Sequence, residues 1–177
     1  MRAFLAVAAA LALMSCATAP TSVSGIGLAP GEGVILIAGP DGSLREVART
    51  DSPNALSATE RAVVAGLRGS TAGMGQNTIP MIGTAADSSE DIETNRIKVR
   101  FLIVAPSDSV LVITNGYGQA VSYRASILVN DHSAPTDVCT VLPTMHGVEH
   151  WPYLIDRIEL SDMRLIPWRQ GDAPHCE

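Results

Sequence analysis

Lysine is nearly absent from this 177-residue chain, and acidic side chains outnumber basic ones. Lys98 is the only lysine among 12 basic residues, and the formal net charge at pH 7 is −6. Because a protein that binds phosphate backbones needs a basic surface, this balance argues against a nucleic-acid partner. We therefore predict that the protein does not bind nucleic acid.

The chain also lacks an apolar run long enough to cross a bilayer as a helix. The longest uncharged apolar run near the N-terminus covers residues 3–14, whereas a spanning helix needs about 20 residues. Charged residues, glycine or proline interrupt every later run. The sequence thus predicts no transmembrane helix.

The common catalytic signatures are missing as well. The chain contains no G-x-S-x-G elbow, no P-loop, no C-x-x-C pair and no G-x-G-x-x-G after a strand. We predict no catalytic residues, no cofactor and no bound metal, and we keep an enzymatic role as an alternative.

What is present at the N-terminus is an export signal. Residues 1–20 read MRAFLAVAAALALMSCATAP, with Arg2 as a short positive region before the apolar run. Leu13-Met14-Ser15-Cys16 resembles the lipobox of bacterial lipoproteins, in which a leucine stands three residues before the cysteine and a small residue directly before it. Cleavage after Ala19 is the competing interpretation, but it would leave Pro20 first, which signal peptidase disfavours.

The resemblance implies a small lipoprotein of the Gram-negative cell envelope. In that family the cysteine, here Cys16, receives a diacylglyceryl group, residues 1–15 are removed, and the new N-terminus is acylated with a palmitate-type chain. Three acyl chains, at about 0.8 kcal/mol per buried CH₂, hold a protein permanently on a membrane. Ala17 after the cysteine, where aspartate would retain the protein at the inner membrane, implies the outer membrane facing the periplasm.

The composition along the chain suggests one folded domain behind a tether. Residues 16–33 are rich in small residues and glycine, which predicts a flexible tether, and residues 34–177 would form the domain. Every aromatic residue after the signal peptide lies beyond residue 100. Since aromatic side chains dominate burial, we expect the densest core within about 96–168.

Three cysteines are an odd number for an exported protein. If Cys16 carries lipid, Cys139 and Cys176 remain as a pair in an oxidising compartment. We predict a disulfide bond between them, with two free thiols as the alternative.

The hydrophobic pattern predicts a mainly β fold, an antiparallel β-sandwich-like single domain, with α+β as the alternative. Apolar residues alternate with polar ones along 96–104 and 119–129. Two hairpins are expected, one around Gly39-Pro40-Asp41-Gly42 and one at Asn115-Gly116. A capping box from Ser57 to Glu60 predicts one short helix over 58–68. The predicted strands cover 34–38, 43–49, 96–104, 110–114, 119–129, 136–142 and 157–166.

His146-Gly147-Val148-Glu149-His150 matches H-x-x-E-H, the pattern of the inverzincin metalloproteases. There both histidines bind zinc and the glutamate activates water, which requires a helix to bring positions i and i+4 onto one face. Gly147 inside the pattern and Trp151-Pro152 directly after it disfavour a helix. We predict ordinary loop histidines. The alternatives are a metal-dependent hydrolase using His146, Glu149 and His150, and a structural metal site on a loop formed by His146 and His150, with or without His175.

Trp151-Pro152-Tyr153 is the candidate binding surface, because aromatic residues beside a proline are typical of exposed recognition segments. The alternative is that these residues anchor a loop across the edge of the sandwich. The function we expect is a non-enzymatic binding or envelope-assembly module, held on the membrane by its lipid and facing an envelope protein as partner. A purely structural envelope protein is a further alternative.

Overall fold

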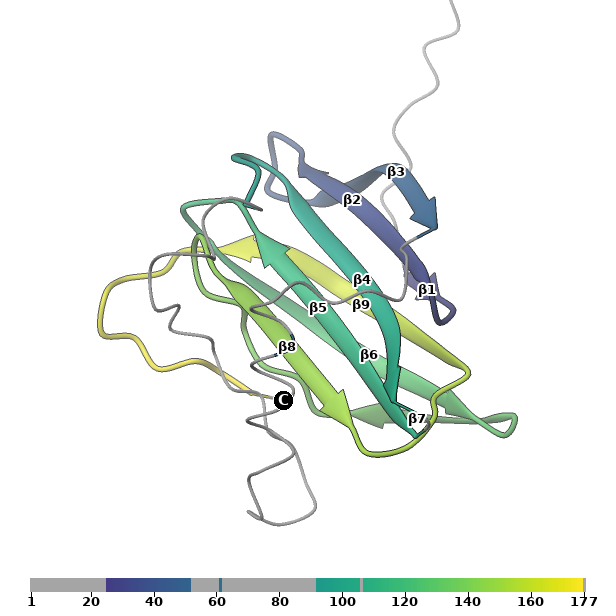
Figure 1. The fold of residues 1–177 in the computed structure, drawn as a ribbon. Coiled ribbons are helices and arrows are strands. Elements are labelled where there is room, and N and C mark those ends of the chain that lie inside the picture. Colours follow the sequence, from purple (N-terminus) through teal and green to yellow (C-terminus); the bar gives the residue numbers. More distant parts are fainter. Residues whose placement is uncertain (1–24, 52–60, 62–91, 106, 177) are drawn as a thin grey trace, which may run out of the picture.

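The computed structural model describes residues 25–51, 61, 92–105 and 107–176. Within these residues, nine strands form two antiparallel sheets that pack face to face as a β-sandwich (Figure 1). The prediction of a mainly β, sandwich-like domain is confirmed. The predicted helix over 58–68 lies outside the described residues except for Arg61, which is helical. No helix within the described part is long and apolar enough to cross a membrane.

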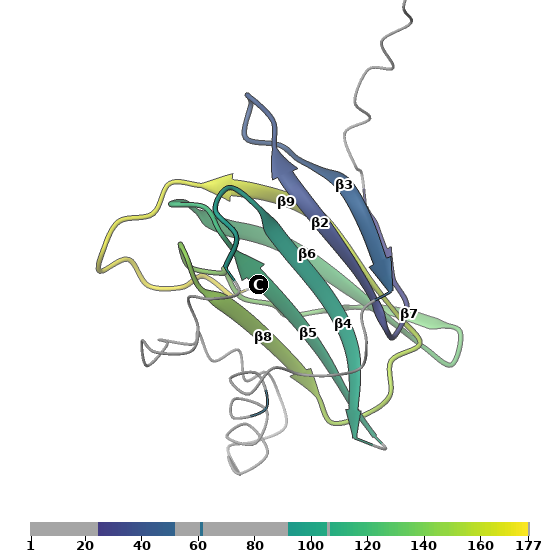
Figure 2. The same ribbon diagram turned by 45° about the horizontal axis from the view of Figure 1, so that its top comes forward.

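The four-stranded sheet has the order β1-β9-β6-β7. Its strands are β1 (Ile26–Leu28), β6 (Ala120–Val129), β7 (His132–Thr136) and β9 (Arg157–Ile166). The five-stranded sheet has the order β3-β2-β4-β5-β8. Its strands are β2 (Glu32–Ala38), β3 (Leu44–Asp51), β4 (Ile97–Ala105), β5 (Asp108–Asn115) and β8 (His146–Trp151). Figure 2 shows the β2–β3 hairpin projecting beyond the other strands at one end of the sandwich.

The core lies between the two sheets and follows the alternation in the sequence. The inward residues of β6 are buried as predicted, and in β4 Phe101 is fully buried at the centre. Alternate side chains of one strand point to opposite faces, and on the other side of the five-stranded sheet Leu102, Val110, Val112 and Val148 form a second, smaller buried cluster. The fully buried large side chains include Leu28, Leu36, Phe101, Leu111, Ile113, Ile158 and Leu160.

The predicted tether over 16–33 is wrong for its second part. Ile26 and Leu28 are 3% and 0% exposed, and β1 pairs with β9 at the edge of the four-stranded sheet. Gly27 fits there because a Cβ at its position would overlap the Arg157 side chain. The small residues, which suggested a flexible segment, therefore allow β1 to lie close to β9. The folded domain begins by residue 26.

Asn115-Gly116 does not form the predicted hairpin. β5 pairs with β4 and β8, whereas β6 pairs with β7 and β9, so the chain crosses from one sheet to the other after Asn115. The Asn115 side chain is fully buried and makes this corner by donating to the Gln119 and Leu142 carbonyls at 2.8 and 2.9 Å. Its oxygen accepts the Tyr117 N–H at 3.0 Å.

The other strand predictions hold with one exception. The hairpin around 39–42 and the strand over 157–166 are confirmed, and Asp162 has a φ of 52° at an irregularity in the β6–β9 pairing. The strand predicted over 136–142 is displaced to β7, which ends at Thr136. Residues 139 and 141 instead make isolated bridges to Cys176 and Val121.

Candidate functional site

The H-x-x-E-H segment is strand β8, at one edge of the five-stranded sheet. The prediction that it is not helical is correct, but the predicted loop is wrong. Each residue from His146 to Trp151 has a register partner on β5, and Pro152, which cannot donate a ladder hydrogen bond, follows the last one. The sequence pattern is therefore that of an edge strand.

The strand conformation separates the residues that a zinc protease would bring together. His146 and His150 lie on the same face but four residues apart, which in a strand is about 13 Å. Glu149 points to the opposite face, into the space between the sheets, where it is 5% exposed. The geometry needed for two histidine ligands and a neighbouring catalytic glutamate is absent from this segment.

Each histidine has its own polar neighbour on β5. The His146 Nδ1 lies 2.9 Å from the Thr114 hydroxyl, and the His150 Nε2 lies 3.2 Å from Asp108 Oδ2. His175 is on the C-terminal tail, where its carbonyl accepts the Thr140 N–H and hydroxyl. Within the described residues, no group of three or more His, Cys, Asp or Glu side chains is arranged to hold a metal ion.

Glu149 is buried between the two sheets, whereas the sequence predicted that it lies in a loop. One carboxylate oxygen accepts the Cys139 backbone N–H at 3.0 Å and the Tyr123 hydroxyl at 3.2 Å. Burial raises the pKa of Tyr123 well above its usual value, and the Glu149 carboxylate raises this pKa further by its charge and by accepting the hydroxyl proton. The alternation along β8 could have indicated this burial, because residues 149 and 151 of a strand share one face and Trp151 is a large apolar side chain.

Cys139 and Cys176 lie at disulfide-bonding distance, with their Cα atoms 4.0 Å apart. The tail after β9, in yellow in Figure 1, returns to the segment that carries Cys139. That segment runs between the sheets' edges, because Val141 bridges to Val121 of β6 and its side chain packs against Gly147 of β8. The two cysteines therefore close one open side of the sandwich.

The candidate binding surface Trp151-Pro152-Tyr153 divides into an anchor and an exposed part. Trp151 is only 7% exposed, and its indole N–H donates to the Thr136 hydroxyl at 3.0 Å. Tyr153 and Leu154 are 42% and 49% exposed, and Pro152 is exposed beside them. We call Pro152, Tyr153 and Leu154 the apolar tip.

The apolar tip is held firmly on both sides. After it, Ile155 is buried, and its N–H donates to the Ser109 hydroxyl at 2.9 Å. The Asp156 N–H then donates to the Leu128 carbonyl at 2.9 Å. Among the large hydrophobic side chains of the described residues, Val47 is the only other one comparably exposed.

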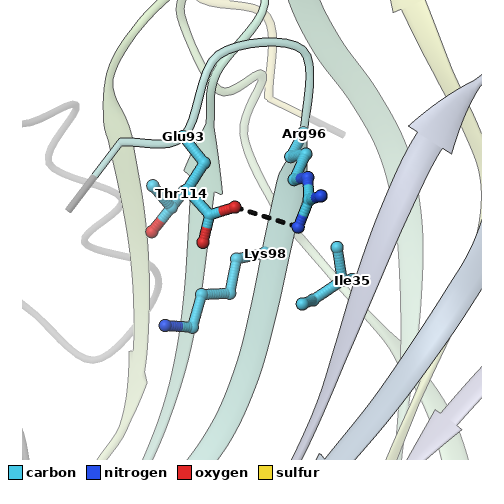
Figure 3. A pocket seen from close by; sticks show the side chains of 5 residues that line it. All are labelled: Ile35, Glu93, Arg96, Lys98 and Thr114. Carbon is cyan, nitrogen blue, oxygen red and sulfur yellow. Dashed lines mark ion pairs between the residues drawn. The ribbon is translucent and has the colours of Figure 1, made fainter.

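A hollow lies on the outer face of the five-stranded sheet (Figure 3). It is shallow and open to solvent, and its space together with the solvent at its mouth amounts to about 240 Å³. Sequence reasoning did not identify it, although the only lysine of the chain, on the polar side of a predicted strand, was a signal. Its lining residues are Ile35 of β2, Lys98 of β4, Thr114 of β5, and Glu93 and Arg96 just before β4.

No protein-family model matches this chain, and neither the curated proteins nor the solved structures contain a match. Function therefore has to be argued from the residues themselves.

Proposed function

We propose that the protein is a lipid-anchored lipoprotein of the Gram-negative envelope that binds a partner protein through the apolar tip, without enzymatic activity. The anchor rests on the lipobox residues ending at Cys16. The binding role rests on one observation, the pair of exposed apolar side chains Tyr153 and Leu154 on a loop fixed at both ends. An exposed apolar group on a rigid support favours association, because little conformational entropy is lost on binding.

The compartment we propose fits the cysteine pair. A Cys139–Cys176 disulfide persists in the periplasm and would be reduced in the cytoplasm. Because the tail carrying Cys176 has no strand pairing beyond isolated bridges, a covalent link there stabilises its attachment.

The position of β1 supports an outward-facing tip. Ile26 pairs with Leu160 and Leu28 pairs with Ile158, so β1 runs toward the start of β9 and the loop that carries the tip. The chain enters β1 travelling toward that end. From Cys16 to Gly25 the chain reaches at most about 30 Å. Because the tether is short, we expect the end of the domain toward which β1 runs, the end with the apolar tip, to face the periplasm.

Intact mass spectrometry on protein extracted with mild detergent from a Gram-negative host tests the anchor. We expect cleavage before Cys16, acylation, and a mass two hydrogens below that of the dithiol form. A Cys16→Ser variant should lose both acylation and membrane attachment. An unacylated chain that begins at Pro20 would contradict the proposal.

Site-specific photocrosslinking in intact cells tests the binding role. A photoreactive residue at position 153 should give a discrete protein adduct that Leu154→Ser abolishes. The same residue at position 47 is the matched control, because Val47 is comparably exposed on β3 but has only the small Ala48, and no second large apolar side chain, exposed beside it. Identical adduct patterns from positions 153 and 47 would exclude the apolar tip as the binding surface.

A further inference from the structure

The hollow beside Lys98 is formed by side chains from three neighbouring strands. Ile35, Lys98 and Thr114 are register partners across β2, β4 and β5, so they form one row on the outer face of the sheet. Glu93 and Arg96 stand at one end of this row (Figure 3). Because the sheet backbone fixes the row, the lining groups converge without any rearrangement.

The charges around the hollow leave one positive group without a counter-ion. Glu93 and Arg96 pair with each other at 3.0 Å and neutralise one another. Lys98 is exposed and has no ion-pair partner among the described residues. In Figure 3 its ammonium lies on the Thr114 side of the hollow, away from Arg96. A ligand that enters therefore meets one unpaired positive charge.

The rest of the lining is suited to a small apolar group. Ile35 is half-buried and contributes an aliphatic wall, and the methylene stem of Lys98 contributes another. Thr114 adds a hydroxyl whose oxygen lies 2.9 Å from His146 Nδ1. When Nδ1 carries the proton, it donates to Thr114, and the threonine O–H is free to donate to a ligand oxygen.

We propose that this hollow binds a terminal carboxylate carried on a short aliphatic group, as at the alanyl end of a short peptide. The single negative charge matches the single ammonium of Lys98, the one charged group around the hollow that has no ion-pair partner among the described residues. The aliphatic part lies against Ile35, and the carboxylate lies between Lys98 and Thr114. This site is independent of the lipid anchor and of the apolar tip.

The test uses the full chain in detergent micelles, labelled with ¹³Cε-lysine. Because Lys98 is the only lysine, the label gives one side-chain signal without any assignment. Acetyl-alanyl-alanine is titrated in, followed by its C-terminal amide. We expect the free carboxylate to shift the Lys98 signal saturably and the amide to leave it unchanged.

Substitution separates the site from general charge effects. Lys98→Gln, followed through the backbone amides of Ile35 and Thr114, should weaken binding about tenfold, or about 1.4 kcal/mol, through the loss of a charge-assisted hydrogen bond. Arg157→Gln removes an exposed cation from the other sheet and should leave the affinity unchanged. Equal shifts with the acid and the amide, or unchanged binding by Lys98→Gln, would overturn the proposal.

Discussion

At the scale of single residues, the most unusual feature is a carboxylate placed between two apolar sheets. Glu149 is tolerated there because the Cys139 N–H and the Tyr123 hydroxyl donate to it. A buried charge without such donors would be strongly destabilising. Glu149 therefore connects β8, β6 and the segment that carries Cys139. The contribution of this side chain to stability depends on the protonation of Tyr123, because only the protonated hydroxyl can donate to it.

Tyr123 makes the folded protein sensitive to alkaline pH. Its pKa is raised in the folded state, so above pH of about 10 the unfolded chain loses the phenolic proton while the folded chain keeps it. Stability should therefore fall as the pH rises through about 10, by about 1.4 kcal/mol for each further pH unit. Unfolding in urea at pH 8, 9, 10 and 11 measures this loss.

A Tyr123→Phe variant should be less stable at pH 8, by about 1 kcal/mol for the lost hydrogen bond, but should lose less stability between pH 9 and 11. Tyr153→Phe is the control, because Tyr153 is exposed at the apolar tip. Equal alkaline losses in the unaltered protein and in Tyr123→Phe would show that Tyr123 does not cause the pH dependence.

At the scale of strands, the connections decide which sheet each strand joins. β4 and β5 form a hairpin within one sheet, but the short segment after β5 carries the chain across to β6 in the other sheet. Asn115 makes this possible because its amide satisfies backbone groups that a hairpin ladder would otherwise pair. A side chain thus replaces the ladder hydrogen bonds that are lost at the corner.

Asn115→Ala should destabilise the protein by about 2 kcal/mol, because it leaves part-buried carbonyls at Gln119 and Leu142 without their donor. Gln119→Ala is the matched control: its exposed side chain is removed while its carbonyl remains. We expect a change of less than about 0.5 kcal/mol in the control. Urea unfolding curves give both values, and equal costs would contradict the role of the Asn115 amide.

At the scale of the whole molecule, the sandwich is closed on one side by chain that forms no regular strand. The segment around Cys139 bridges to β6 through Val141, packs on Gly147 of β8, and receives the C-terminal tail at Cys176. The tail is held by the Thr140–His175 hydrogen bonds and the cysteine pair. These contacts join residues 35 and 37 positions apart.

Replacing both cysteines by serine should lower the free energy of unfolding by about 4 kcal/mol, the loop-closure value for this separation. The comparison is the unaltered protein with and without a thiol reductant. The reductant should destabilise the unaltered protein toward the double variant and leave the variant unchanged. No change in either comparison would mean that the pair does not stabilise the fold.

Alternation in the sequence was enough to identify most of the strands and the fold class. Val121 and Tyr123 were expected to face inward and do so, because a period of two leaves an antiparallel strand one consistent orientation. The pairing of Cys139 with Cys176 followed from the number of cysteines, since these two remain if Cys16 carries lipid. These features depend on residues close in sequence or on counting, so they need no knowledge of tertiary packing.

The errors concern residues whose role depends on a distant partner. Gly25-Ile26-Gly27 has the composition of a linker, but Ile26 gains a place in the core only because β9 offers an edge. His146 to His150 lacks a strong strand signal, and β5 supplies the pairing. In the row of Ile35, Lys98 and Thr114, β4 and β5 are consecutive strands, but Ile35 of β2 stands 63 positions before Lys98.

The sequence by itself determined the strand periodicity and the pairing of the cysteines, since each follows from local spacing or residue count. Only the tertiary structure decided that β1 belongs to the domain, that Asn115 turns the chain between sheets, and that Glu149 is buried while Tyr153 and Leu154 are exposed. The physical reason is that burial and pairing are properties of two segments together, and a local pattern records only one of them.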